Sequence, residues 1–385
     1  MDNLNRHFAP INNSLLSDIE SLESTQLGTQ VDFHTENNFP ELKQKKIVLF
    51  SVGEYEGSKN NSDNIDNLRV VLYKLHLAKS VKMVDLGSVR LMPTRKESFG
   101  IIEEICSVLI KNELFPIIIG GGNDISYAVY KAYARIKKFI TLTAVDSQFD
   151  LGLHDDLLSS NSYLSKIIQY KPSYLFHYVN LAYQSYYVSP KAVELISDLG
   201  FESIRLGKMR ADISCVEPIM RNTDFLSFDM SAIKHSCFPA NVYSSPNGLD
   251  GEDVCKIMRY AGVSDKVSCL GFFEYNQDLD NYNQSALLLS QMIWYFLDGY
   301  SIRMNELNPD LKNCIKYTVP FEDGKNEIVF YKSKLSGRWW MGVPFVNKNN
   351  KTLENYFVAC SYYDYEIATK GDIPERWIRT QNKFV

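Results

Sequence analysis

The chain has 385 residues, a net charge of -5 and a hydrophobic fraction of 45%, which is the composition of a soluble globular protein large enough for one α/β domain with extensions. It lacks the basic excess of a nucleic-acid-binding protein, and no apolar run approaches the roughly 18 residues of a membrane-spanning helix. We therefore expect no nucleic-acid partner, no membrane insertion and, because the first ten residues carry no basic start followed by an apolar run, a cytoplasmic location.

Residues 1–44 are rich in Asn, Ser and Glu, and no strand signal appears before the run KKIVLF. We interpret this segment as an N-terminal arm that precedes the folded domain.

Residues 45–300 alternate short β-rich runs with segments of helical length. The eight runs are IVLFSVG, VKMVDLG, PIIIGGG, ITLTAVD, VNLAYQS, SIRLGKM, FLSFDMS and VSCLGFFEY. This alternation predicts a mainly parallel eight-stranded sheet with helices on both faces, which is a three-layer α/β/α domain. A helix over 284–300 is expected to end it.

Residues 301–385 are aromatic and rich in turns, which predicts short antiparallel strands and a final helix packed on the core. Three of the four tryptophans, Trp339, Trp340 and Trp377, lie here, with Arg338 and Arg376 directly beside them. Aromatic side chains next to arginine are typical of interfaces, so one hypothesis is a protein partner or a homo-oligomer. The alternative is that these rings seal the extension onto the core.

The seven cysteines are scattered and form no CxxC pair. Their apolar surroundings are typical of reduced core residues. Cys237 lies near His235, but neither a strand-to-helix elbow nor an orienting acid accompanies them, so Cys/His catalysis is disfavoured.

Polar side chains follow four of the predicted strands. In a parallel sheet the carboxyl ends of the strands carry the functional residues. Alternate residues at a strand end point the same way, which groups the acids and amides after each strand on one side. We expect one pocket at this edge, lined by Asn123, Asp146, Gln148, Asp150, Asp229, Ser231 and Glu274.

These motifs resemble the ureohydrolase family of arginase, agmatinase and formimidoylglutamase, most closely the last, over roughly residues 45–300. GGGND is similar to the family's GGGHD, DSQFD to DAHxD, SFDMSAIKHSCFP to SxDxDxxDPxxxP, and GFFEYNQDLD to VElNPxxD. The segment SPNGLDGEDVCKIMRYAG also resembles PxGLxxxE. The resemblance implies an arginase-like fold, in which two manganese ions share a hydroxide that attacks a guanidinium or amidine carbon.

The same resemblance implies six metal ligands, two His and four Asp, and here only Asp146, Asp150 and Asp229 match. Asn123 and Gln148 stand at the two His positions, and Ser231 stands at one Asp position. Neutral oxygen ligands suit manganese poorly where imidazole is preferred, whereas three carboxylates could hold one Mg²⁺ or Ca²⁺ weakly. We expect no resident cofactor, and in particular not two Mn²⁺ ions.

Three further positions leave alternatives open. Lys234 stands where the family usually has another Asp, and it either neutralises the acid cluster or extends into solvent. His235 is the only histidine near a motif and is a weak candidate ligand. Glu274 matches the acid that grips the substrate's cationic group, and it either still binds a cation or serves an internal hydrogen-bond network. The segment 157–166 lacks the family's proton-transfer His.

The leading hypothesis is a pseudoenzyme of this family that acts as a cytoplasmic binding or assembly component. The alternative is an active hydrolase of linear amidine C–N bonds, formimidoylglutamase-like, with a rewired or single-metal site.

Overall fold

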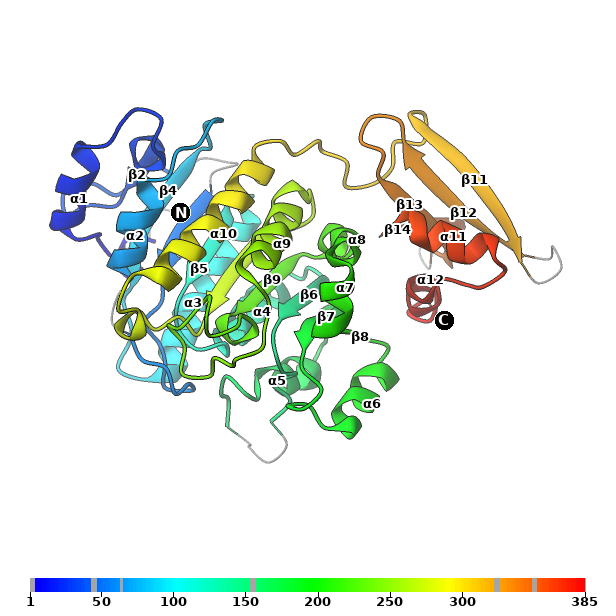
Figure 1. Cartoon of the computed structure of the whole chain (residues 1–385), viewed down its shortest axis with the longest axis horizontal. Coiled ribbons are helices and arrows are strands. Elements are labelled where there is room, and N and C mark those ends of the chain that lie inside the picture. Colours follow the sequence, from blue (N-terminus) through cyan, green and yellow to red (C-terminus); the bar gives the residue numbers. More distant parts are fainter. Residues whose placement is uncertain are drawn as a thin grey trace.

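The computed structural model describes residues 4–42, 47–62, 65–152, 157–321, 326–347 and 352–384. Its main body is one large twisted sheet between helices, and a smaller sheet follows at the C-terminal end (Figure 1). The strands of the large sheet run in the order β1-β4-β3-β5-β10-β9-β6-β7-β8, with β2 also paired to β4. They are β1 (Phe8–Ala9), β2 (Val31–Phe33), β3 (Ile47–Ser51), β4 (Met83–Val89), β5 (Phe115–Ile119), β6 (Ile140–Val145), β7 (Leu175–Tyr183), β8 (Glu202–Arg205), β9 (Phe225–Asp229) and β10 (Cys269–Phe273).

The eight strands from β3 to β10 pair in parallel, and each overlaps one of the eight predicted runs. Continuous Ile, Val, Leu and Phe runs form these strands because both faces of the sheet are covered by helices. Every residue of β3, β5, β6, β9 and β10 is buried. The predicted three-layer α/β/α fold is confirmed.

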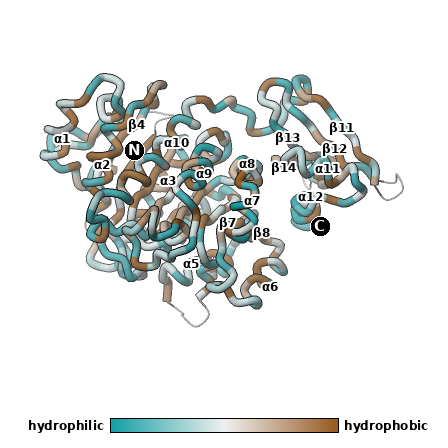
Figure 2. The backbone as a smooth tube through the Cα atoms, in the orientation of Figure 1, coloured by the Kyte–Doolittle hydropathy of each residue, from teal (hydrophilic) through white to brown (hydrophobic). Residues whose placement is uncertain are grey.

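The helices form two layers, one on each face of the sheet. The core on one face includes side chains from α2 (Asp66–Tyr73), α7 (Leu206–Ala211), α8 (Val216–Asn222), α9 (Gly251–Val263) and α10 (Gln284–Tyr300). The core on the other face includes side chains from α3 (Arg95–Lys111), α4 (Ile125–Arg135), α5 (Tyr163–Gln169) and α6 (Pro190–Asp198). Figure 2 shows hydrophobic stretches running through the interior of this body. Within the described ranges, no helix is long and apolar enough to cross a membrane.

The N-terminal segment contributes to the sheet, so the expectation that it has no strand before KKIVLF was wrong. Strand β1 pairs antiparallel with β4, β2 pairs in parallel with β4, and α1 (Asn13–Glu20) packs beside α2. Strands of two and three residues are too short to show a period in the sequence. Phe8 lies in the core with its ring centroid 5.6 Å from that of Phe50.

The C-terminal residues form a four-stranded antiparallel sheet and two helices. Its strands are β11 (Cys314–Phe321), β12 (Asn326–Ser333), β13 (Trp339–Val346) and β14 (Leu353–Cys360), and its helices are α11 (Tyr362–Thr369) and α12 (Glu375–Gln381). The seven cysteines of the chain are free thiols, and Cys106, Cys255, Cys269 and Cys360 are buried as predicted, whereas Cys215, Cys237 and Cys314 are partly exposed.

Two of the tryptophans considered as surface anchors are inside the molecule. Trp339 is 7% exposed and belongs to the core beneath α11, whereas Trp340 is 1% exposed and lies on the opposite face of β13. Trp377 is partly buried, and its indole N–H donates to the carbonyl of Gly342. Trp339 and Trp340 therefore pack against other parts of this chain. Binding of a partner protein stays a prediction.

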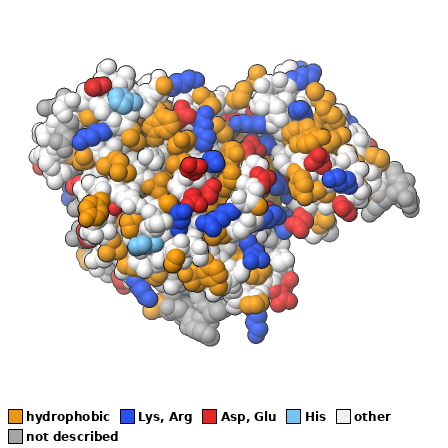
Figure 3. All heavy atoms as spheres, in the orientation of Figure 1, with side chains coloured by type: hydrophobic (Ala, Val, Ile, Leu, Met, Phe, Trp, Pro, Cys, Tyr) orange, Lys and Arg blue, Asp and Glu red, His pale blue; other side chains and the backbone are white. Residues whose placement is uncertain are grey.

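Arg221 of α8 joins the two sheets. Its guanidinium donates to the carbonyl of Cys360 at 2.8 Å and to that of Trp339 at 3.1 Å, and it lies 5.0 Å from the ring centroid of Trp340. Asn222 and Ala359 add a reciprocal pair of hydrogen bonds. Figure 3 shows basic and acidic side chains gathered at this boundary between the main body and the C-terminal sheet. The junction is therefore polar as well as aromatic.

We predict that Arg221→Ala lowers the free energy of unfolding by about 3 kcal/mol, because it leaves buried carbonyls without a donor and uncovers Trp340. Denaturant titration followed by tryptophan fluorescence measures the change. Arg135→Ala, at a half-exposed side chain on α4, is the control and should change stability by less than about 0.5 kcal/mol. Equal effects of the two substitutions would contradict the assigned role of Arg221.

Candidate functional site

The seven predicted site residues come together at the carboxyl ends of four adjacent strands. Strands β5, β10, β9 and β6 are neighbours in the sheet. Asn123 follows β5, the segment 146–150 follows β6, Asp229 ends β9, and Glu274 follows β10. The crossover connections of a parallel sheet thus bring residues from distant parts of the sequence to one edge.

Three carboxylates form the centre of the site. Asp146, Asp150 and Asp229 each place a carboxylate oxygen within 4.8 Å of the others, and their exposed fractions are 3%, 8% and 6%. Burial raises the pKa of all three carboxyl groups, and repulsion from Asp146 raises the pKa of Asp150 and Asp229 further. In the part of the chain that the structure describes, no Lys, Arg or His makes an ion pair with this triad. A shared proton or a bound cation must therefore balance its charge.

Asn123 presents hydrogen-bond donors to the triad. Its side-chain Nδ2 donates to Asp150 Oδ2 at 3.0 Å and to Asp146 Oδ2 at 3.3 Å. Its Oδ1 accepts from the hydroxyl of Ser227 at 3.1 Å. The amide oxygen thus points away from the carboxylates.

Gln148 and Ser231 contact the acids mainly through their backbone. The N–H of Gln148 donates to Asp146 Oδ1 at 2.9 Å, and the N–H of Ser231 donates to Asp229 Oδ1 at 2.6 Å. The Gln148 side chain lines an open cavity that also includes Asp150 and Tyr187. Asp150 is thus the member of the triad that borders this cavity.

Glu274 is completely buried and accepts four hydrogen bonds. One carboxylate oxygen accepts from Asn123 N at 2.9 Å and Ser160 Oγ at 2.5 Å. The other accepts from Asn60 Nδ2 at 2.6 Å and from the hydroxyl of Ser58. Donors from this chain therefore surround both oxygens, which is the arrangement of an internal hydrogen-bond network.

The backbone at two of these acids lies in the left-handed region, with φ of 50° at Asp150 and 66° at Glu274. Such angles are costly for residues other than glycine and are concentrated at functional sites. The backbone at Asp150 and Glu274 therefore adopts an unfavourable conformation that the surrounding structure must stabilise.

Lys234 does not neutralise the triad, so the first of its two alternatives was wrong. Its ammonium pairs with Asp250, the residue before α9. His235 is exposed and its Nδ1 hydrogen-bonds with the hydroxyl of Ser244 at 3.1 Å. Both side chains interact with the loop that precedes α9 instead.

These residues differ from the six-ligand set that the resemblance implies for a pair of manganese ions. The acid, thiol and imidazole groups that gather around one point, among the residues the structure describes, are the three carboxylates alone. At one of the two positions where the resemblance implies an imidazole ligand, Asn123 offers N–H groups to those carboxylates. Manganese binds electron-pair donors, and an N–H group cannot serve as one.

Sequence reasoning missed the donors around Glu274 and Asn123. Ser58 and Asn60 lie in a loop after β3, more than 200 positions from Glu274 in the sequence. Ser160 lies in the segment 157–166, which the motif comparison considered only for its missing His. The several serines of that segment were the one sequence feature that could have indicated these hydrogen-bond donors.

Comparisons with known proteins agree on one family. A sequence model of the arginase family matches residues 53–298. Formimidoylglutamase of Staphylococcus aureus (strain MRSA252) is 24% identical over 303 residues, which cover 76% of this chain and 92% of that enzyme.

Solved structures show the same fold. Trypanosoma cruzi formiminoglutamase with Mn²⁺ has a TM-score of 0.61 at 21% identity, covering 67% of this chain and 94% of that one. Formimidoylglutamase from Bacillus subtilis has a TM-score of 0.62 at 16% identity, covering 75% of this chain and 99% of that one.

We predict that Glu274→Gln lowers the free energy of unfolding by about 2 kcal/mol, because the new amide N–H₂ must face two of the donors around the carboxylate. Denaturant titration checks this, with the exposed Glu194→Gln on α6 as control. An unchanged stability would show that the four donors do not depend on the carboxylate.

Proposed function

Because the chain belongs to the arginase family, we propose that it is a ureohydrolase relative that has lost the dinuclear manganese site and acts as a binding or assembly component. The orientation of Asn123 carries this proposal, since its N–H₂ group donates to two of the three remaining acids. An amide held in this way by Ser227 stabilises the carboxylates directly and takes over part of the role of a cation.

The hydrogen bonds of Glu274 support the same proposal. A carboxylate that grips a guanidinium or amidine needs free lone pairs on its oxygens. Here Ser58, Asn60, Ser160 and the backbone of Asn123 already use them. A cationic substrate would have to displace donors that belong to the folded chain, which is costly for a buried group.

A second candidate function is a hydrolase of linear amidine C–N bonds with a single metal ion. The convergence of Asp146, Asp150 and Asp229 favours it, because three carboxylates within 4.8 Å could hold one hard cation such as Mg²⁺. Such an ion would act as a Lewis acid. Asp150 borders the open cavity and would face the entering substrate, while Asn123 would orient the carboxylates.

We predict that the protein, purified with Mn²⁺ present, carries fewer than two Mn²⁺ ions per chain and hydrolyses neither arginine, agmatine nor N-formimidoylglutamate. Elemental analysis and product assays measure the two quantities. Two stoichiometric ions, or turnover above about 1 s⁻¹ on any of these compounds, would refute the pseudoenzyme. Activity with one stoichiometric Mg²⁺ would select the second candidate.

We also predict that the triple variant Asn123→His, Gln148→His and Ser231→Asp binds Mn²⁺, because it completes the ligand set that the family resemblance implies. Binding should stabilise the fold by about 2.7 kcal/mol at a free metal concentration one hundred times the dissociation constant. Thermal unfolding with Mn²⁺ and with EDTA measures this, and the unmodified chain is the control. Activity need not return, since the segment 157–166 contributes no His. A melting temperature that does not change with Mn²⁺ would mean that the strand ends do not hold these side chains in the geometry that two metal ions require.

A further inference from the structure

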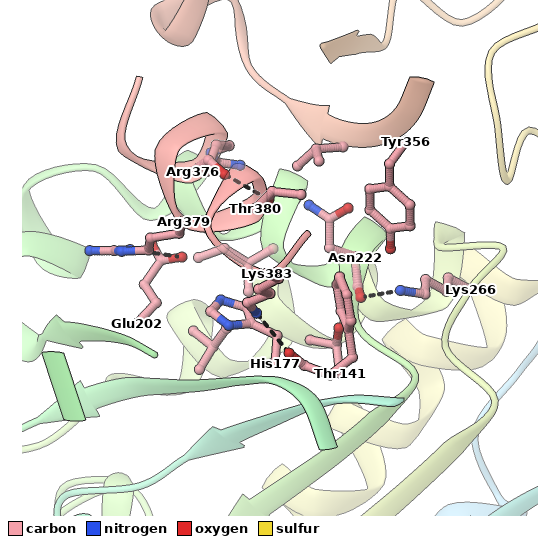
Figure 4. Close-up of a pocket in the computed structure, with 14 residues that line it drawn as sticks. Thr141, His177, Glu202, Asn222, Lys266, Tyr356, Arg376, Arg379, Thr380 and Lys383 are labelled. Carbon is pink, nitrogen blue, oxygen red and sulfur yellow. Dashed lines mark hydrogen bonds and ion pairs between the residues drawn. The ribbon is translucent and has the colours of Figure 1, made fainter. Parts of the chain in front are cut away.

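A second cluster of charged side chains lies at the amino-terminal ends of the strands of the large sheet, opposite the carboxyl ends that carry the first site. A small cavity there is bounded by the first residues of β6, β7 and β8 and by α12 with the residues that follow it (Figure 4). The site with the three carboxylates lies at the carboxyl ends of the strands, so this cavity and that site are separate. The C-terminal extension supplies one wall of this cavity and the family domain supplies the other.

The cavity is lined by more positive than negative charge. Its basic side chains are Lys266, Arg376, Arg379 and Lys383, and its one acidic lining residue is Glu202. Three of these cations have carboxylate partners: Lys266 pairs with Asp224 at 3.3 Å, Arg376 with Asp364 at 3.2 Å, and Arg379 with Glu202 at 3.4 Å.

Lys383 has no such partner among the residues that the structure describes. Its ammonium donates to the carbonyl of Phe176 at 2.7 Å and lies 4.6 Å from the centroid of the Phe176 ring. A carbonyl and a ring face compensate a positive charge only partly. Within the described residues, Lys383 is therefore the one of these four cations that forms no ion pair with a carboxylate.

His177 adds a free hydrogen-bonding group. Its Nδ1 is buried and has no hydrogen-bond partner. Burial and the nearby cations, Lys383 first, hold the pKa of His177 well below its usual value, so the ring is neutral and can donate from one nitrogen. A buried polar atom without a partner in the wall of this cavity calls for an explanation, and a molecule bound beside it would supply one.

We propose that this cavity binds a small dianionic oxyanion, such as a phosphate group, through Lys383, Arg379 and His177. The cavity has space for only a few water-sized groups, which suits an oxyanion and excludes a nucleotide base. Arginine and lysine are the usual ligands of such anions. The anion would contact both the family domain and the C-terminal extension and so link them.

The proposed site has a defined pH dependence. Burial, and then repulsion from Lys266 and Arg379, lower the pKa of Lys383 to about 7. Because this pKa lies below that of an unfolded lysine, the charged ammonium destabilises the fold, fully below about pH 7 and less as the pH rises above it. Glu202 on β8 opposes this shift, whereas Arg379 on α12 adds to it; His177 on β7 stays neutral. A dianion removes the cost, so binding should strengthen as the pH falls through about 7.

Sulfate is the probe, because it stays doubly charged over the whole range while phosphate itself titrates near neutral pH. Calorimetric titration of the full chain at about pH 6 and pH 8.5, with ionic strength held constant by NaCl, should show saturable binding that is roughly 30-fold weaker at the higher pH. This factor is the ratio of protonated Lys383 at the two values for a pKa of about 7.

The variants separate this site from a general salt effect. Lys383→Met should abolish saturable sulfate binding at about pH 6, and Arg379→Gln should weaken it, whereas the exposed Lys370→Met should leave it unchanged. Sulfate also stabilises proteins by exclusion from their surface, which would raise all melting temperatures equally. Equal stabilisation of the four proteins without saturable binding, or equal affinity in Lys383→Met, would overturn the proposal. So would acetate binding as tightly as sulfate, because the site is assigned to a dianion.

Discussion

The desolvation of charged groups is the constraint on which both ends of this sheet depend. A buried carboxylate or ammonium loses its hydration and stays charged only where donors, acceptors or counter-charges replace the water. Four acids meet at the carboxyl ends of the strands, and the chain replaces the lost water around Glu274 and around the other three acids in different ways. Glu274 receives four donors, while the cluster of Asp146, Asp150 and Asp229 receives the Asn123 amide and retains raised pKa values.

The same constraint explains how the C-terminal sheet is attached. Arg221 is nearly buried, and its charge is satisfied by Glu217, by two backbone carbonyls and by the face of Trp340. Burial, and then repulsion from Lys266 and Arg379, lower the pKa of Lys383, and no described carboxylate forms an ion pair with it, which is why we propose an anion beside it. The junction therefore contains one cation, Arg221, that pairs with a carboxylate and one, Lys383, that does not within the described residues.

The packing of the sheet and the polar side chains at the carboxyl ends of its strands depend on different residues. The sheet is held by buried aliphatic and aromatic side chains on both faces, and these lie within the strands. The ligand positions lie just beyond the strand ends, in loops whose geometry is set by backbone hydrogen bonds and by positive φ angles. A substitution at these loop positions can therefore change the chemistry without removing a side chain from the core.

The sequence by itself determined the eight core strands, their parallel arrangement and the gathering of Asn123, Asp146, Asp150, Asp229 and Glu274 at one edge. These features follow from local hydrophobic runs and from motif order, which are written along the chain. The sequence did not determine the strands β1 and β2, the Asp250 partner of Lys234 or the donors around Glu274. Nor did it reveal the burial of Trp339 and Trp340 or the cavity around Lys383. Each of these depends on contacts between residues far apart in the chain, and only the folded structure decides which polar group meets which partner.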